Sequence, residues 1–221
     1  IQRAQTDNYG HNPRLSRTHV PLLSQRPISM IPYTWQAIKS RQANSTKGLD
    51  METGSKNKWD QRYREQQFDP NIEPLSFLKE KLDPSIGDRA LCIAAGNGRN
   101  AVYLAQKGFQ VDAVDISEEG LRICVRLAES RGVHINPIQA DLLDYELKQD
   151  RYDLVTKFFY YQPALFEPIA RSLRPGGHFM FQTFSRDQLT SSTGPRNPDH
   201  LAQGDDILSG FFGLRLRFYE D

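Results

Sequence analysis

Short apolar runs alternate along this chain with segments that have the spacing of helices. The apolar runs, which have the length of buried strands, are residues 90–94, 109–114, 134–140, 152–158 and 178–183. The helical segments are residues 56–66, 74–82, 98–107, 118–130 and 165–173. Strands that alternate with helices are typical of an α/β fold with a doubly wound, mainly parallel sheet.

Single residues refine this predicted topology. Pro137 has no backbone N–H to give to a strand ladder, so residues 134–140 belong at a sheet edge. The third strand takes that place in a doubly wound sheet of order 3-2-1-4-5. Ser117 stands where it can cap the fourth helix, and Cys124 falls on the apolar side of that helix. We therefore expect Cys124 to be a core residue.

The two ends of the predicted domain are less regular. Trp59 and Tyr63 are four positions apart in the polar helix 56–66, so their rings share one face and either cover a ligand or pack on the core. Near the other end, the RPGG turn at residues 174–177 leads into the fifth strand. A last strand is expected at residues 214–219 after a long loop.

The most informative stretch is LCIAAGNGRN, in which a strand runs into a glycine turn that opens a helix. Glycine there permits tight backbone conformations and the close approach of a ligand. The spacing Gly96-x-Gly98-x-x-Ala101 matches the dinucleotide fingerprint, and Asp115 ends the next strand, where a carboxylate can hold ribose hydroxyls. The pattern indicates a nucleotide-cofactor site, although a tight turn beside an ordinary surface aspartate has the same sequence.

Two cofactors share this scaffold. NAD needs room for a pyrophosphate at the helix N-terminus and is usually accompanied by a substrate domain, and neither feature is visible. S-adenosylmethionine carries a carboxylate, a ribose and an adenine but no phosphate. Asp141 follows the third strand, where its carboxylate can accept a hydrogen bond from the adenine amino group. The alternative role for Asp141 is to cap the following turn.

Charge divides the chain into two unlike parts. Seven basic and two acidic residues give residues 1–50 a net charge of +5, so the whole-chain charge of +1 leaves −4 for residues 51–221. Residues 1–50 lack sustained periodicity and are interrupted by prolines, which predicts a disordered basic extension. Its composition is that of a transit peptide, of an upstream extension or of a family-specific arm. Residues 51–221 form the predicted folded domain.

Composition also excludes several classes of function. The mildly acidic folded part has no general nucleic-acid footprint, and no apolar run is long enough to span a bilayer. The two cysteines fit a reducing compartment rather than a disulfide framework, and the five histidines show no zinc-like spacing. We expect a cytoplasmic protein without a metal, or an organellar one if residues 1–50 are a transit peptide.

Several separated blocks of the sequence match one family in order. These blocks are GNGRNAVYLAQKGFQVDAVDIS, IQADLLDYEL, LRPGGHFMFQTFS and STGPRNPDHL, and WDQRY looks like the family's N-terminal helix. Together they resemble the class I methyltransferases of the tellurite-resistance and thiopurine-methyltransferase-like group over about residues 58–219. The resemblance implies a Rossmann-like fold that binds S-adenosylmethionine at the carboxyl ends of its strands.

The resemblance also implies roles for individual residues. Gly96, Asn97 and Gly98 would pass under the methionine portion of the cofactor. Asp115 would hold the ribose, and Ile116, Asp141 and Leu142 would surround the adenine. The predicted cofactor-binding set is therefore Ala94, Gly96, Asn97, Gly98, Asn100, Asp115, Ile116, Asp141 and Leu142. Arg99 either pairs with the methionine carboxylate or forms an ion pair on the helix surface.

Four departures from the family pattern stand out. Cys92 and Ala94 occupy positions where an acidic residue and a glycine are common. We expect an ordinary backbone at Ala94, because alanine adopts positive φ only at a cost, and a weaker cofactor affinity. Lys157 is expected to point outward, away from the cofactor's sulfonium. Because the chain stops at Asp221, the sheet is expected to lack its last antiparallel strand, through truncation or as an exposed edge.

The function implied is methyl transfer from S-adenosylmethionine to a small-molecule acceptor, either a thiol or a chalcogen oxyanion. Soft nucleophiles of this kind need little help from a general base. Tyr160 and Arg196 are the catalytic candidates, against the alternatives of aromatic packing for Tyr160 and a solvated loop for Arg196. An NAD-binding oxidoreductase and a non-catalytic binding module are the alternative functions, and the oligomeric state is left open.

Overall fold

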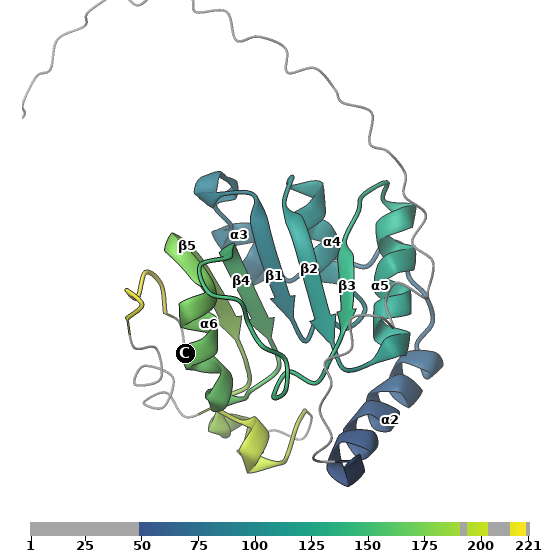
Figure 1. The fold of residues 1–221 in the computed structure, drawn as a ribbon. Coiled ribbons are helices and arrows are strands. Elements are labelled where there is room, and N and C mark those ends of the chain that lie inside the picture. Colours follow the sequence, from purple (N-terminus) through teal and green to yellow (C-terminus); the bar gives the residue numbers. More distant parts are fainter. Residues whose placement is uncertain (1–48, 191–193, 203–212, 220–221) are drawn as a thin grey trace, which may run out of the picture. The chain divides into compact units, whose positions relative to one another are not determined.

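The protein folds around a five-stranded, all-parallel sheet (Figure 1). The computed structural model describes residues 49–190, 194–202 and 213–219, with side chains from Gly54 onward. The strands are β1 (Arg89–Ile93), β2 (Gln110–Asp115), β3 (Asn136–Gln139), β4 (Tyr152–Phe158) and β5 (Leu173–Gln182). Their order is β3-β2-β1-β4-β5, which confirms both the doubly wound topology and the edge position of the strand that holds Pro137.

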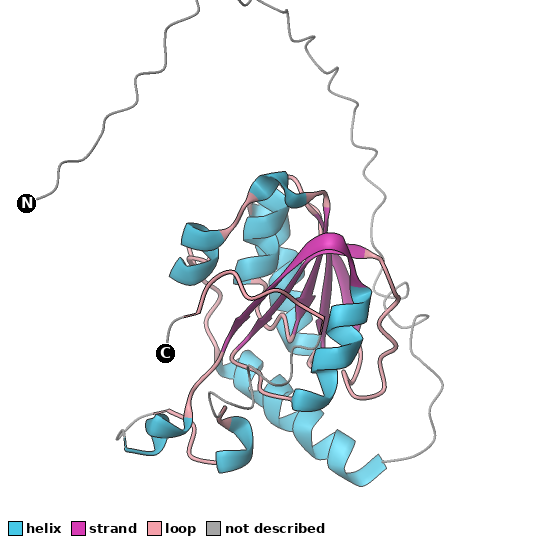
Figure 2. Cartoon of the chain, turned by 90° about the vertical axis from the view of Figure 1, so that its left-hand side faces the viewer, coloured by secondary structure: helices cyan, strands magenta, loops and turns pink. Residues whose placement is uncertain are grey.

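Helices cover both faces of this sheet, as the edge-on view in Figure 2 shows. The α-helices are α2 (Leu49–Glu65), α3 (Ser76–Lys81), α4 (Arg99–Gln106), α5 (Glu118–Ser130) and α6 (Phe166–Ser172). Short 3-10 helices follow at η1 (Pro84–Ile86), η2 (Pro163–Leu165), η3 (Arg186–Thr190) and η4 (Pro198–His200). None of the helices in the described ranges is long and apolar enough to cross a membrane.

Alternation along β1 divides the core into two layers. Cys92 faces the layer that contains α3, α4 and α5, where Cys124 is fully buried as predicted. Ile93 faces the layer closed by α6, where Ile169 is fully buried. Ser117 caps α5 as predicted, because its hydroxyl accepts a hydrogen bond from Gly120 N at 3.0 Å. The carboxyl ends of the strands are left free between these layers.

The boundaries of several predicted elements were wrong. Helix α2 begins at Leu49 rather than at residue 56. Strand β5 begins at Leu173, so the predicted turn at 174–177 lies inside this strand. The pairing of β5 with β4 is irregular there, because its register shifts between Tyr152 and Leu154 of β4. Turn-forming residues are tolerated there because the sheet forms a bulge. The predicted disorder of residues 1–50 concerns a segment that lies outside the described residues except for Leu49 and Asp50, which belong to α2.

The predicted strand at residues 214–219 is absent, because this segment is irregular in the structure. Its described contacts run through side chains: the Phe218 ring lies 6.1 Å from that of Phe77, and Lys81 Nζ lies 3.9 Å from the Phe218 ring. The strands within the described ranges are all parallel.

Candidate functional site

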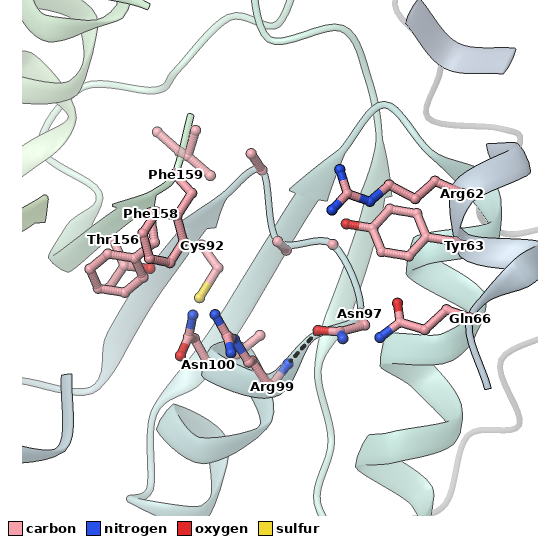
Figure 3. Close-up of a pocket in the computed structure, with 15 residues that line it drawn as sticks. Arg62, Tyr63, Gln66, Cys92, Asn97, Arg99, Asn100, Thr156, Phe158 and Phe159 are labelled. Atoms are coloured by element: carbon pink, nitrogen blue, oxygen red, sulfur yellow. Dashed lines mark hydrogen bonds between the residues drawn. The ribbon is translucent and has the colours of Figure 1, made fainter. Parts of the chain in front are cut away.

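A cavity of about 240 Å³ lies at the carboxyl ends of β1 and β4 (Figure 3). Its lining comes from the end of β1, the turn that follows it, the start of α4, the end of β4, and helix α2. In a doubly wound sheet, ligands bind at this edge, where the strand order reverses between β1 and β4. Four of the predicted cofactor residues line it: Ala94, Gly96, Asn97 and Asn100.

The turn after β1 holds a strained backbone. Ala94 has φ +51°, so the predicted ordinary backbone at this residue was wrong. The turn is fixed on both sides, because Ala95 N donates to Val114 O at 3.0 Å and Gly98 N donates to Ala95 O at 3.0 Å. A left-handed alanine costs about 1 to 2 kcal/mol. Strain of this kind is often concentrated at ligand sites.

Asp115 supports this turn from behind. Its Oδ2 accepts a hydrogen bond from Gly96 N at 2.7 Å, and its Oδ1 accepts one from Ser117 N at 2.8 Å. Burial raises the pKa of Asp115, while these backbone N–H groups oppose the rise. The carboxylate lies behind the turn and does not line the cavity. Each oxygen keeps a second lone pair with which to accept a hydroxyl.

Tyr63 on α2 lies directly against the same turn. A Cβ at Gly96 would overlap the Tyr63 hydroxyl, and a Cβ at Gly120 would come within 2.9 Å of its ring. The Tyr63 and Trp59 rings are stacked with centroids 6.1 Å apart, so the predicted shared face exists. Tyr63 lines the cavity, whereas Trp59 is 37% exposed. Burial raises the pKa of Tyr63, and the hydroxyl therefore stays protonated.

Buried Asp60 fixes α2 in this position. Its Oδ1 accepts hydrogen bonds from Ser117 Oγ at 2.7 Å and from Glu119 N at 3.2 Å, and Lys56 Nζ lies 2.6 Å from its Oδ2. Burial alone would raise the pKa of Asp60, but these hydrogen bonds outweigh burial and lower it. The carboxylate thus joins α2 to the N-terminus of α5.

The start of α4 forms the floor of the cavity. Gly98 has φ +82°, and a Cβ there would overlap Cys124 Sγ, so this glycine permits α4 to pack on α5. Arg99 is half-buried, burial lowers its pKa, and no ion pair joins it to a described residue. The surface ion pair considered for Arg99 is therefore absent from the described part of the chain. Asn100 Oδ1 accepts from Leu75 N at 2.9 Å and so also holds the chain before α3.

The wall opposite α2 combines β1 and β4, and it contributes Cys92, Thr156, Phe158 and Phe159. Burial raises the pKa of the Cys92 thiol to about 12, although a hydrogen bond with Thr156 opposes the rise, so this thiol is not a nucleophile at neutral pH. Phe159 is 43% exposed with φ +56°, and its ring lies 5.1 Å from that of Phe184.

Sequence reasoning did not assign Thr156, Phe158 and Phe159 to the site, nor Arg62 and Gln66 on α2. A signal existed for the residues of β4, because they stand at the carboxyl end of a strand next to the switch in strand order. The position of α2 over the turn depends instead on the contacts of one buried carboxylate. Local patterns in the sequence do not show such contacts.

The remaining predicted residues lie outside the cavity lining. Ile116 is half-buried after β2, and its carbonyl accepts from Gln139 Nε2 at 3.3 Å. Asp141 Oδ1 accepts from Leu143 N at 2.9 Å, which is the turn-capping role considered for it, while Leu142 is buried in the α6 layer. Burial and the charges of Asp141 and Asp115 raise the pKa of Tyr160 to about 12.

Arg196 and Lys157 complete the predicted set. Arg196 is exposed in the loop after β5. Lys157 is 0% exposed, so the expected outward orientation was wrong. Its side chain leaves the face of β4 opposite to Thr156 and Phe158, because successive residues of a strand point to opposite faces. The described residues contain no group of three or more His, Cys, Asp or Glu side chains able to hold a metal ion.

Comparison with known proteins agrees with this geometry. Residues 90–177 match the family model described as a methyltransferase domain. The chain has the class I methyltransferase fold. The match covers β1 to the middle of β5 and therefore includes the turn and the ends of β1, β2 and β4. This match concerns methyltransferase domains in general. The tellurite-resistance and thiopurine-methyltransferase-like subgroup stays a prediction.

Curated relatives carry the same class of name. The ubiquinone biosynthesis O-methyltransferase of Vibrio cholerae is 30% identical over 133 residues, which are 56% of this chain and 54% of the relative. The protein of the same name from Proteus mirabilis is 26% identical over 134 residues, or 56% of this chain and 55% of the relative. The chain spans about half the length of these relatives.

Solved structures share the fold at lower identity. A structure reported for the conversion of a disulfide bond into a thioacetal group during echinomycin biosynthesis has a TM-score of 0.56 and 21% identity, and covers 71% of this chain and 77% of its own. An S-adenosylmethionine dependent methyltransferase from Mesorhizobium loti has a TM-score of 0.50 and 23% identity, with 61% and 76% covered. These similarities concern the fold alone.

Proposed function

We propose that this protein transfers a methyl group from S-adenosylmethionine to a small-molecule acceptor. The observation that carries the proposal is the strained turn after β1, which is supported by Asp115 and borders a cavity at the carboxyl ends of β1 and β4. The methyltransferase domain match over residues 90–177 supports the same conclusion. When bound, the cofactor supplies a methyl group activated by a positively charged sulfur.

The residues present fit such a cofactor. The unpaired guanidinium of Arg99, with the amide of Asn97, suits the carboxylate of the methionine portion. The free lone pairs of Asp115 suit the ribose hydroxyls, and we assign the adenine to Ile116, Asp141 and Leu142, which follow β2 and β3. Ala94 and Gly96 would bring the backbone of the turn close to the ligand, Gly98 lets α4 pack on α5 beneath it, and Asn100 holds the turn against the chain before α3.

The size of the cavity agrees with a site that encloses only the methionine portion of the cofactor. Ligand pockets have volumes of about 300 to 1,000 Å³, so the cavity of about 240 Å³ suits the methionine portion and the reacting groups rather than the whole cofactor. The adenosine portion would extend beyond the cavity, past Asp115 toward Asp141. The protein's contribution to rate is then alignment of the methyl group with the acceptor and exclusion of water by α2 and the aromatic end of β4.

The lining of the cavity favours a soft nucleophile, a thiol or a chalcogen oxyanion. No carboxylate or imidazole occurs among the described residues that line it, and Tyr63 and Cys92 are protonated at neutral pH. An oxygen acceptor, which the O-methyltransferase names of the curated relatives suggest, would need a general base more strongly. Tyr160 would act as a hydrogen-bond donor and Arg196 as an anion contact, rather than as bases.

Calorimetric titration separates this proposal from its two alternatives. We expect S-adenosylhomocysteine to bind to the full chain and NAD⁺ to give no heat. Binding of NAD⁺ alone would favour an oxidoreductase, and no heat from either ligand would favour a non-catalytic module. An acceptor screen with radiolabelled S-adenosylmethionine should then compare aromatic thiols, selenite, tellurite and catechols. Methylation of catechols alone would contradict the proposed soft nucleophile.

A further inference from the structure

Lys157 is a buried amine that the proposed reaction does not use. It is the second-last residue of β4 and is 0% exposed. Its Nζ lies 4.4 Å from the ring centroid of Phe166, 5.1 Å from that of Phe181 and 5.8 Å from that of Tyr160. No carboxylate of the described chain forms an ion pair with it, and burial lowers the pKa of Lys157 to about 7.

A lysine at this position is costly for the fold. An unpaired amine in an apolar layer loses its hydration, and replacing a buried charge by an apolar residue of similar volume often stabilises a protein. Val155 lies two residues earlier on the same face of β4 and is fully buried in the same layer. An apolar side chain therefore suits this layer, and packing alone does not explain a lysine there. Residues that conflict with their surroundings often have a functional reason.

Among the described residues the amine forms one hydrogen bond, and its partner indicates that reason. Lys157 Nζ donates to the carbonyl oxygen of Gln162 at 2.9 Å. Gln162 immediately precedes η2, and the intervening residues form the loop after β4. The bond therefore closes this loop across its base, and the two ends are held together independently of the side chains between them.

This loop carries a residue of the cavity. Phe159 lines the cavity with φ +56°, a conformation that an unrestrained phenylalanine rarely adopts. Phe159 N donates to Gln182 O at 2.8 Å on β5, which fixes the first residue of the loop, while Lys157 fixes the last. Tyr160 lies between these two points. Its ring is one of the three, with those of Phe166 and Phe181, that lie around the Lys157 amine.

We infer that Lys157 is a positioning residue, which holds the loop after β4 so that Phe159 faces the methyl-acceptor side of the cavity. The inference rests on the proposed function for the identity of the acceptor, whereas the loop constraint itself belongs to the free protein. Lys157 touches neither the cavity nor the reacting atoms. It acts through the Gln162 carbonyl and the backbone of the loop.

Hydrogen exchange of the free full-length protein tests the constraint. In Lys157→Met, which keeps the volume but removes the donor, we expect amides of residues 159–165 to exchange about tenfold faster, the change that follows from losing one hydrogen bond of about 1.4 kcal/mol. The midpoint of thermal unfolding should stay equal or rise. The matched control is Val155→Ala on the same face. It should lower that midpoint, and amide exchange in the loop should rise no more than exchange in the rest of the sheet.

Two results would overturn the inference: unchanged exchange at residues 159–165 in Lys157→Met, or equal loop opening in the Val155→Ala control. If Lys157→Met does not fold, Lys157→Leu, which also lacks a donor, replaces it and should show the same local opening. Failure of both variants to fold would assign Lys157 a purely structural role. Binding of S-adenosylhomocysteine to the wild-type protein tests the proposed function separately, so either idea can fail alone.

A kinetic comparison adds a second readout once an acceptor is known from the screen. Lys157→Met should raise KM for the acceptor by about tenfold while KM for S-adenosylmethionine changes little, because the loop faces only the acceptor side. A proportional rise in both values would point to general loosening of the site and would contradict the inference.

Discussion

The carboxylate of Asp60 accepts a hydrogen bond from the Ser117 hydroxyl at 2.7 Å, and this contact helps to join α2, which lines the cavity, to the N-terminus of α5. Ser117 at the same time caps α5, and its backbone N–H donates a hydrogen bond to Asp115. The Asp115 carboxylate in turn supports the glycine turn. The position of α2 is thereby coupled to the turn through two neighbouring residues.

Substitution of Asp60 should affect both stability and cofactor affinity. Asp60→Ala leaves the Ser117 hydroxyl and Glu119 N without their acceptor, and we expect the free energy of unfolding to fall by about 1 to 3 kcal/mol. Affinity for S-adenosylhomocysteine should fall as well, because Tyr63 is carried by α2. Chemical denaturation and calorimetry measure the two effects. The control is Gln61→Ala, which removes an exposed hydrogen bond to Glu65 and should change neither.

Asp115 and Asp153 form a matched pair at opposite ends of the sheet. Each is buried and accepts two backbone hydrogen bonds, in the case of Asp153 from Asp88 N at 3.0 Å and Arg89 N at 2.9 Å. Asp115→Ala should weaken binding of S-adenosylhomocysteine by about 1 to 3 kcal/mol. Asp153→Ala should lower stability and leave that affinity unchanged. Equal affinities in the two variants would remove the ribose role assigned to Asp115.

Arg99 offers a test that distinguishes parts of the ligand. Because its guanidinium lacks an ion pair with the described residues, Arg99→Met should leave the free energy of unfolding nearly unchanged. Affinity for S-adenosylhomocysteine should fall by about 1.5 to 3 kcal/mol through the lost charged hydrogen bond. Affinity for 5′-methylthioadenosine, which has no carboxylate, should not change. A loss with both ligands would show that Arg99 acts on the shape of the site instead.

The pH dependence of stability isolates Lys157. Its pKa is about 7 in the folded protein, against an ordinary value of 10.5. Below pH 7 the folded and unfolded states both carry the proton, so the cost of burying the charge is fully present. Between these two values the unfolded state binds more protons, and stability rises with pH.

We therefore expect Lys157→Met to gain most over the wild type near pH 6 and to lose that gain as the pH approaches 10. The difference should be on the order of a few kcal/mol, at about 1.4 kcal/mol for each unit of pKa. Urea denaturation of both proteins across this range measures it, and the comparison cancels the other titrating groups. A gain that does not vary with pH would mean that Lys157 keeps its ordinary pKa in the folded state.

Strand order and the glycine turn were predictable because they depend on local residue types. Pro137 cannot serve a central strand, and Ser117 before an apolar helix is a strong cap. These preferences act within a few residues of the chain. The observed positions of Pro137 at the sheet edge and Ser117 at the start of α5 follow these local preferences.

The conformations of Ala94 and Lys157 were predicted wrongly because distant contacts decide them. The backbone of Ala94 follows from hydrogen bonds between the turn and β2, which outweigh the preference of alanine for negative φ. The burial of Lys157 depends on rings from α6 and β5 that close around it. Neither arrangement leaves a pattern in the nearby sequence.

The ring of Tyr63 occupies space left open by two glycines from separate segments, Gly96 and Gly120. These three positions therefore behave as one steric unit. Alanine at Gly120 should be tolerated better beside a smaller side chain at position 63, whereas alanine at Gly96 would keep the cost of its φ of +55° even there. Redesign of this side of the cavity for a bulkier acceptor can begin at Tyr63 and Gly120, because a smaller residue 63 relieves the steric limit at Gly120 while Gly96 stays a glycine.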